Sequence, residues 1–457
     1  MPGVIRSCLR RDLAAASVAA FLVLVAVLVG HYVQNTQHNL SVRWAPFVAT
    51  WNPHVGPGTA AAPLVAAAVI AYGPPLADRL PWRGLLPGLW AAAMAWIWSL
   101  ALIDGWWRGI AVKLTTRYEY LQVIDRFDDI PATLRTFNDH ILIGTPDNWP
   151  PHIAGHPPGA TLTFVLLDRI GLGGGAWAGA FVITAGASAA VAVAVAVRAL
   201  ASERLARRAA PFLALVPGAV WMGTSADAYF AGAACWALAL LALAVTRRSL
   251  WWASASGLLF GWCLYLSYGF TLLALLGGGV LLLGRRRLRE RPLLLVHLVA
   301  GLAVAPVAFT LLGFAWWEAY PLLVERYHQG VGGTRPYWYW VWANLALAVV
   351  ITGLATAPGL RRTGAALLAE PRRALTAPGT GGEDAAAARL AVLVAAGLLA
   401  IAAADLSGMS KAETERIWLP FAMWLLPACA FLPRPRGWLA AQAVLALLVN
   451  HLLLTSW

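Results

Sequence analysis

The sequence predicts an all-α, polytopic membrane protein. Of its 457 residues, 60% are hydrophobic and only 12% are charged, and the mean hydropathy is +0.67. A soluble domain does not expose that much apolar surface to water. Apolar stretches of about 20 residues recur along the whole chain, and each is long enough to cross roughly 30 Å of hydrocarbon, where backbone groups must be paired within helices.

These stretches predict about thirteen membrane helices. The first follows Arg6, Arg10 and Arg11 as a signal peptide would, but its apolar run is long and lacks a small-residue cleavage site, so we expect it to be retained. Residues 158–171 could form a further helix, and no β-strand is expected. The predicted spans are 13–33, 60–75, 85–104, 175–197, 209–224, 227–246, 251–268, 270–284, 293–316, 338–357, 388–405, 417–432 and 438–456.

The spans divide the chain into four parts. Residues 1–84 hold N-terminal membrane helices, residues 85–357 form a central module with a large outer loop at 105–160, and residues 388–457 hold the last helices. Between them, residues 358–387 are rich in Ala, Gly, Pro and Arg without an apolar period, which predicts a flexible cytoplasmic linker.

Lysine and arginine favour the cytoplasmic ends of membrane helices. A cytoplasmic N-terminus places most basic residues inside, including the RRRLRER run at 285–291, and most acidic residues outside. We therefore attribute the net charge of +13 to topology and contact with anionic lipid in the cytoplasmic membrane, and expect no nucleic-acid binding. None of the cysteines lies in an outer loop, so no disulfide framework is expected: Cys8, Cys235, Cys263 and Cys429.

The position of the ionisable residues favours an outward-facing enzyme over a transporter. A transporter needs such groups near the bilayer midplane. Here His297 is the main polar residue inside a span, whereas Asp104, Asp227 and Asp405 lie at outer helix ends.

The second outer loop holds a cluster of carboxylates in RYEYLQVIDRFDDIPATLRTFNDHI, residues 117–141. Glu119, Asp125, Asp128 and Asp129 lie close together in sequence. Crowded carboxylates in a partly desolvated loop have raised proton affinities, which suits a general base. The alternative is structural, because Asp128 or Asp129 could cap the helix that follows.

The same loop ends in HIAGHPPGATL, residues 152–162. Two prolines and a glycine make a rigid corner where the chain re-enters the membrane. His156 would be held at this corner, in reach of a lipid headgroup, although His152 and His156 could also be merely solvated.

This order of features resembles the GT-C class of integral-membrane glycosyltransferases, especially protein O-mannosyltransferases and bacterial enzymes that use polyprenyl-phosphate sugars. The resemblance covers about residues 85–350 and extends to KAETERIW at 411–418. It implies that the catalytic base is Glu119, Asp125, Asp128 or Asp129, and that His156-Pro157-Pro158-Gly159 corresponds to the family's His-Pro-Pro-Leu corner. The acidic loop follows the third helix here rather than the first, and the family's Asp-Glu pair is absent.

Breaking the bond from sugar to phosphate leaves negative charge on the phosphate, so cations are needed at the outer face. ERYHQGVGGTRPYWYW, residues 325–340, offers Arg326, His328 and Arg335, and SGMSKAETERIW, residues 407–418, offers Lys411 and Arg416. Structural alternatives are an aromatic belt for the first segment, a Lys411–Glu415 helix pair, and an Arg416 that snorkels to the interface.

The sequence thus predicts a membrane glycosyltransferase, transferring a hexose or pentose with inversion from a polyprenyl-phosphate donor to a glycan, lipid or protein hydroxyl. No organic cofactor is expected. The clustered acids would accommodate a divalent metal, but their spacing does not demand one. The main alternative function is a flippase or exporter of lipid-linked sugars, and a non-catalytic scaffold is a further one.

Overall fold

Long Ala-, Leu- and Val-rich runs form the long helices of the protein, as predicted. The computed structural model describes residues 2–369, 378 and 381–456. The first elements are α1 (Pro2–Gln37), β1 (Ala49–Trp51), α2 (Gly58–Arg79), α3 (Trp82–Ala101), η1 (Trp107–Ala111), η2 (Lys113–Thr115), η3 (Tyr120–Phe127), α4 (Ile130–Thr136), η4 (Phe137–His140), α5 (Pro151–Ala154), α6 (Pro158–Arg169), α7 (Gly175–Leu200), α8 (Glu203–Ala214) and α9 (Ala219–Met222). The remaining elements are α10 (Ala226–Arg247), α11 (Leu250–Leu266), η5 (Tyr268–Leu272), α12 (Leu273–Glu290), α13 (Leu293–Leu311), α14 (Trp316–Gln329), α15 (Val331–Thr334), α16 (Tyr337–Thr352), α17 (Thr356–Ala369), α18 (Gly382–Leu406), α19 (Thr414–Ile417), α20 (Leu419–Ala422), η7 (Leu426–Phe431), α21 (Pro435–Leu452) and β2 (Leu453–Thr455).

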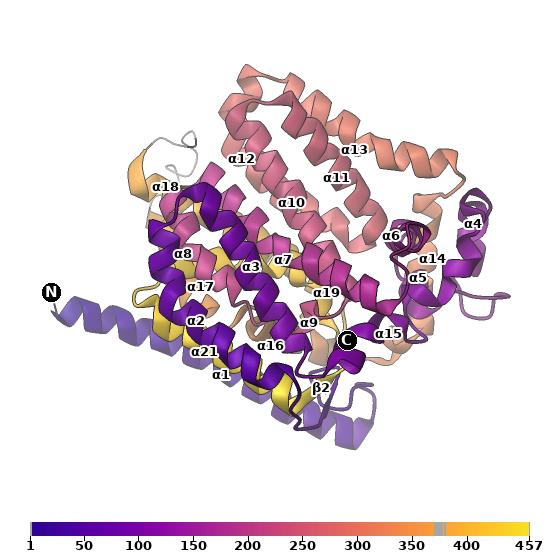
Figure 1. Cartoon of the computed structure of the whole chain (residues 1–457), viewed down its shortest axis with the longest axis horizontal. Coiled ribbons are helices and arrows are strands. Elements are labelled where there is room, and N and C mark those ends of the chain that lie inside the picture. Colours follow the sequence, from indigo (N-terminus) through magenta and orange to yellow (C-terminus); the bar gives the residue numbers. More distant parts are fainter. Residues whose placement is uncertain (1, 370–377, 379–380, 457) are drawn as a thin grey trace.

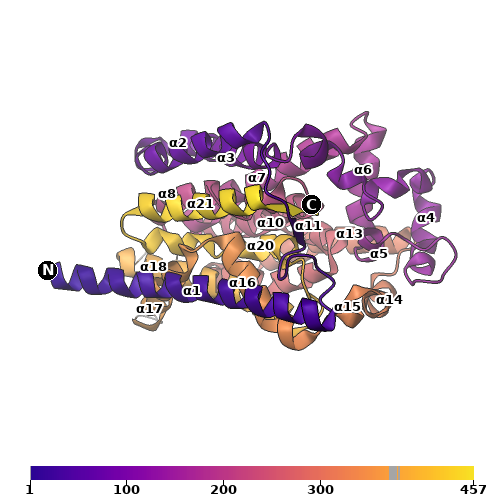
Figure 2. The ribbon, with the colours of Figure 1, turned by 90° about the horizontal axis from the view of Figure 1, so that it is seen from below.

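Eight helices of the described chain are long and apolar enough to cross a membrane, which makes the protein an all-α polytopic membrane protein. They are α1, α2, α3, α7, α10, α12 with η5, α13 and α18. A ninth span would be α16 with α17, which are bent by 99° at the break between them. In Figure 2, the axes of α1, α2 and α21 are roughly parallel.

Several predicted spans are shorter or broken. The segment 209–224 divides into α8 and α9 around Pro217 and Gly218, and 417–432 divides into α19, α20 and η7. Prolines lack the amide proton that a continuous helix requires, which explains both interruptions. The segment 251–268 forms α11, with 17 residues, and the further helix anticipated at 158–171 is present as α6.

The expected flexible linker at 358–387 is helical at both ends. Its first residues belong to α17, which begins at Thr356, and its last belong to α18, which begins at Gly382. Residues 370–377, 379 and 380 lie outside the described part of the chain. The Ala-rich composition favours helix at either side, because alanine has the highest helix propensity.

The expectation that the chain has no strands is wrong at one place. β1 in the first predicted outer loop pairs antiparallel with β2 near the C-terminus, with Ala49 opposite Thr455. Lys113 reinforces the pairing from the second loop, since its Nζ donates to the Thr455 carbonyl at 3.0 Å. The first loop, the second loop and the C-terminal segment are therefore held together.

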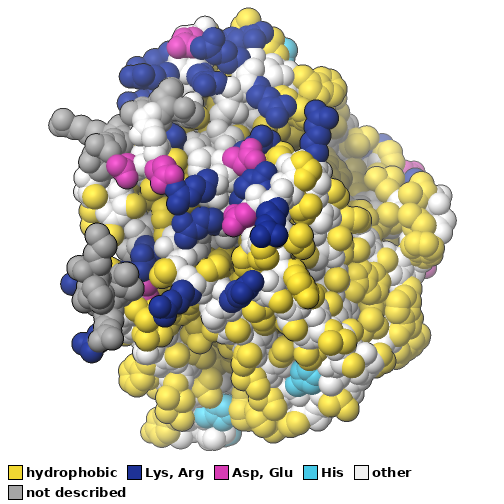
Figure 3. All heavy atoms as spheres, turned by 60° about the vertical axis from the view of Figure 1, so that its left-hand side comes forward, with side chains coloured by type: hydrophobic (Ala, Val, Ile, Leu, Met, Phe, Trp, Pro, Cys, Tyr) yellow, Lys and Arg dark blue, Asp and Glu magenta, His cyan; other side chains and the backbone are white. Residues whose placement is uncertain are grey.

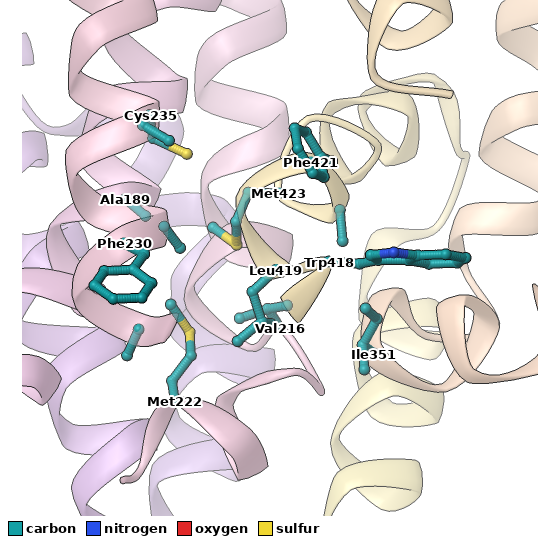
Figure 4. Packing of buried hydrophobic residues seen from close by; sticks show 14 of the residues in the cluster. Ala189, Val216, Met222, Phe230, Cys235, Ile351, Trp418, Leu419, Phe421 and Met423 are labelled. Atoms are coloured by element: carbon teal, nitrogen blue, oxygen red, sulfur yellow. The ribbon is translucent and has the colours of Figure 1, made fainter. Parts of the chain in front are cut away.

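Small residues allow the central helices α7 and α10 to pack closely. A Cβ added at Gly186 would lie 2.8 Å from the Cβ of Ala228, so only glycine fits there. Around this pair lies a large apolar core, part of which Figure 4 shows: Phe230 of α10, Met222 of α9, and Trp418 and Leu419 at the start of α20. This apolar core lies next to the polar residues that are described in the following section.

Candidate functional site

Five polar side chains from four distant segments meet in one largely buried network, in which His152 and Glu413 are partly exposed. Glu119 precedes η3, His152 lies on α5, Asp227 lies in the first turn of α10, and Glu413 and Arg416 belong to the start of α19. We call these five residues the Arg416 network. Figures 1 and 2 place the surrounding elements α5, α6, α14 and α15 at one end of the molecule, away from α8.

Arg416 is the centre of this network. Its Nη1 donates to Asp227 Oδ2 at 2.6 Å, and its Nη2 donates to Glu413 Oε2 at 2.6 Å. The residue is only 5% exposed. A buried guanidinium is stable only when carboxylates compensate its charge, and here two do so.

His152 connects Arg416 to Glu119. Arg416 Nη2 lies 3.2 Å from His152 Nε2, and His152 Nδ1 lies 2.9 Å from Glu119 Oε1. Arginine can only donate, so Nε2 must accept, and the proton of the neutral imidazole then resides on Nδ1. His152 consequently donates to the Glu119 carboxylate and fixes its orientation.

The network sets the charge states of Glu413 and Arg416. Burial alone would raise the pKa of Glu413, but the positive charges of Arg416 and Arg335 outweigh it and lower that pKa to about 2. Burial disfavours the charged form of Arg416, yet Asp227 and Glu413 more than compensate and raise its pKa above the ordinary value. Arg416 and Glu413 are therefore both ionised near neutral pH.

The chain makes an unusual turn to place Glu413. Ala412 and Glu413 both have positive φ, +68° and +63°, a left-handed conformation that residues other than glycine rarely adopt. Arg335 stabilises this turn from α15: its Nη1 donates to the Lys411 carbonyl at 2.7 Å and approaches Glu413 Oε1 at 3.4 Å. Lys411 in turn contacts the segment that holds Arg335, because its Nζ donates to the Gly332 carbonyl at 2.9 Å.

His156 lies beside the network, in the His-Pro-Pro-Gly corner. Its Nδ1 is 2.7 Å from the His152 carbonyl, and its ring contacts Tyr120 and Phe230. Burial lowers its pKa to about 4, although Asp227 acts in the opposite direction. Gly159 lets this corner dock against α11, since a Cβ there would lie 2.6 Å from the Tyr265 carbonyl oxygen.

Three of the four carboxylates considered as the base lie outside the network. Asp125, Asp128 and Asp129 are exposed, and none is ion-paired with another described residue. Asp129 caps α4, because its Oδ1 accepts from the Ala132 amide at 3.0 Å. Glu119 differs from all three, being only 6% exposed.

Two of the candidate cations, Arg326 and His328, make no hydrogen bond or ion pair with the Arg416 network among the described residues. Arg326 Nη2 donates to the Trp149 carbonyl at 3.3 Å, while its Nη1 is buried without a hydrogen-bond partner among the described residues. Burial lowers the pKa of Arg326. His328 is exposed, and its Nδ1 is 2.8 Å from the Val324 carbonyl of its own helix.

Three members of the Arg416 network were not predicted as site residues from the sequence: His152, Asp227 and Glu413. Asp227 carried a usable signal, because a carboxylate in the first turn of an apolar helix requires a partner. The partner could not be identified, since 189 residues separate it from Arg416. In the described chain, no group of three or more His, Cys, Asp or Glu side chains is arranged to hold a metal ion.

Comparison with known proteins gives two structural likenesses. No protein-family model matches the chain, and no curated protein sequence matches it. Two crystal structures of the Archaeoglobus fulgidus oligosaccharyltransferase resemble its fold. One, tethered to an acceptor peptide with the NVT sequon, has 13% identity and a TM-score of 0.43 over 76% of this chain and 49% of that chain. The other, a complex with Zn and sulfate, has 14% identity and a TM-score of 0.42 over 80% of this chain and 53% of that chain. The chain thus spans about half the length of these proteins.

Proposed function

We propose that the protein is a membrane glycosyltransferase of GT-C type, with Glu119 as its catalytic base. The observation that carries this proposal is the chain of contacts from Arg416 through His152 to Glu119. It orients one buried carboxylate at the base of the large loop, whereas the three neighbouring carboxylates face solvent. An oriented and partly desolvated carboxylate is what general-base catalysis requires.

In the proposed reaction the donor is a polyprenyl-phosphate sugar and the acceptor is a hydroxyl group. Glu119 takes the hydroxyl proton while the acceptor oxygen forms a bond to the anomeric carbon. The bond from that carbon to the phosphate oxygen breaks, and the electron pair leaves with the polyprenyl phosphate. Attack opposite the leaving group inverts the anomeric configuration.

In this proposal, the phosphate of the donor is bound by cations that lack a carboxylate partner. Arg416 already has two carboxylates, so its role is to hold Asp227, Glu413 and His152 in place. Lys411 and Arg326 donate only to backbone carbonyls among the described residues, so their charge is available for a phosphate. His156, neutral at physiological pH, would contact the headgroup as a hydrogen-bonding group.

The proposed site lies on the outer face of the cytoplasmic membrane. Basic side chains concentrate at the other end of the molecule, where the cytoplasmic side is expected. The transferred sugar in this proposal is a hexose or a pentose. The acceptor is a hydroxyl group of a glycan, a lipid or a protein.

Reconstituted vesicles test this proposal against an exporter. The purified chain would be placed in vesicles containing polyprenyl phosphates that carry radiolabelled hexoses or pentoses, with glycan, lipid and peptide acceptors outside. A transferase moves the label from the polyprenyl lipid to an acceptor. Label that changes leaflet but stays on the polyprenyl lipid would replace this proposal with the exporter.

A further inference from the structure

A cavity of about 680 Å³ lies at the end of the molecule away from the Arg416 network. It is formed where α7, α8, α12 and α18 meet. Figure 3 brings this end forward and shows dark-blue Lys and Arg side chains gathered over it. Its volume is in the range of pockets that bind small ligands. Its charged lining residues are Arg198, Arg204, Arg208, Arg287, Arg389, Glu203, Glu383 and Asp384.

A second, smaller cavity shares two of these arginines. It has a volume of about 360 Å³ and is also lined by Arg204 and Arg208. These residues are four apart on α8, so both project from one face of the helix between the two cavities. The second cavity adds Arg207, Arg434 and Asp78. Among the described residues that line the two cavities, arginines therefore outnumber carboxylates.

Not all of these arginines are neutralised by carboxylates. Arg198 pairs with Glu203 at 2.8 Å, and Arg204 pairs with Glu383. By contrast, Arg208 donates to the Leu432 carbonyl at 3.0 Å, and Arg287 donates to the carbonyls of Thr246 and Pro378. Among the described residues, the positive charges of Arg208 and Arg287 have hydrogen-bond acceptors but no carboxylate in contact.

The surroundings of Arg208 also disfavour its charged form. Burial and the nearby charges of Arg204 and Arg362 lower its pKa below the ordinary value, although Asp78 and Glu383 act in the opposite direction. An anion in the cavity would compensate the positive charges of Arg204 and Arg208. Arginines whose only role is to set the membrane orientation would be expected on an open, solvated surface. The arginines described here line a cavity instead.

We infer that this cavity binds a phosphate-bearing ligand. The planar guanidinium matches two phosphate oxygens at once, which makes arginine the preferred residue for such groups. The ligand is the headgroup of an anionic lipid, or a soluble phosphate compound that reaches the same face. This inference does not depend on the transfer reaction, because the cavity and the Arg416 network share no residue.

Thermal unfolding of the purified full chain in a neutral detergent tests the inference. The additives are phosphatidylglycerol, phosphatidylcholine and pyrophosphate, each titrated separately. Stabilisation by phosphatidylglycerol alone identifies the lipid headgroup, and stabilisation by pyrophosphate identifies a soluble ligand. Absence of any stabilisation relative to phosphatidylcholine would overturn the inference.

Variants locate the effect in the cavity. In Arg208→Gln/Arg287→Gln, the concentration of anion needed for half-maximal stabilisation should rise at least tenfold. Arg83→Gln, which changes an exposed arginine outside both cavities, should respond like the unmodified chain. If the double variant does not fold, the single change Arg204→Gln, at an exposed position, takes its place. An equal response in the cavity variant and the control would contradict the inference.

Discussion

Arg416 and Asp227 form a buried ion pair, with 2.6 Å between Nη1 and Oδ2 and both side chains 6% exposed. The pair joins α19 to the first turn of α10. Because Arg416 also contacts Glu413 and His152, one guanidinium connects the segment around α19 to a central helix and to the large loop. The stability of this end of the molecule should therefore depend strongly on Arg416.

Replacing Arg416 by methionine should destabilise the protein by about 3–5 kcal/mol, because Asp227 would remain as an uncompensated buried charge and Glu413 would keep only Arg335 as a partner. Reversible unfolding in mixed micelles measures the change. In Arg416→Met/Asp227→Asn the charge of Asp227 is removed as well, so the double variant should be more stable than the single one. A double variant that loses the sum of the two single effects would count against the ion pair.

Glu415 predicts a pH dependence of stability. Its Oε1 accepts from the Val48 amide at 3.1 Å, and burial raises its pKa from 4.5 to about 7. Between these values the unfolded chain releases a proton that the folded protein keeps, so stability falls as pH rises from 4.5 through 7. The loss is about 3 kcal/mol at about 1.4 kcal/mol for each pH unit.

Glu415→Gln removes this titration while keeping an oxygen for the Val48 amide. Between pH 5 and pH 8 the unmodified chain should lose about 2.5 kcal/mol more of its unfolding free energy than Glu415→Gln does. Equal pH profiles for both proteins would show that the pKa of Glu415 is the same in the folded and unfolded states, which would contradict this prediction.

Asp129 should be structural rather than catalytic. Asp129→Ala removes the cap of α4 and should cost about 1 kcal/mol of stability, with transfer activity changed less than twofold. Asp128→Asn serves as the control, because Asp128 is exposed and does not cap the helix. A loss of transfer of a hundredfold or more in folded Asp129→Ala would move the base from Glu119 to Asp129.

Packing of α7 against α10 can be tested at a single glycine. Gly186→Ala should destabilise the protein by about 1–3 kcal/mol, since the new Cβ would overlap the Cβ of Ala228. Gly278→Ala is the matched control in α12, where a Cβ would meet nothing within 4 Å. Comparable losses in both variants would point to backbone effects instead of helix contact.

The long helices could be predicted because a run of about 20 apolar residues has few alternatives in a membrane. The breaks in 209–224 and 417–432 were missed, although Pro217, Pro420 and Pro427 mark them. Hydropathy averages over a window, so it conceals a local loss of hydrogen bonding at proline.

The site was predictable only in part. Local sequence indicated four residues that the structure places in the Arg416 network or at the turn before Glu413. They are Glu119, Arg335, Lys411 and Arg416. Local sequence could not separate Glu119 from the acids that follow it, because burial depends on how the loop packs onto α5 and α10. Asp227 became a site residue only through contact with a segment 189 residues away.

The central claim is that Glu119 removes the proton of the acceptor. Its most direct test is the turnover rate of sugar transfer by purified Glu119→Gln, measured beside Asp125→Asn and the unmodified chain in vesicles. The predicted result is a kcat lowered by about 10²- to 10⁴-fold in Glu119→Gln, with an unchanged unfolding midpoint, and a near-normal kcat in Asp125→Asn. A folded Glu119→Gln that transfers sugar at the normal rate would contradict the account.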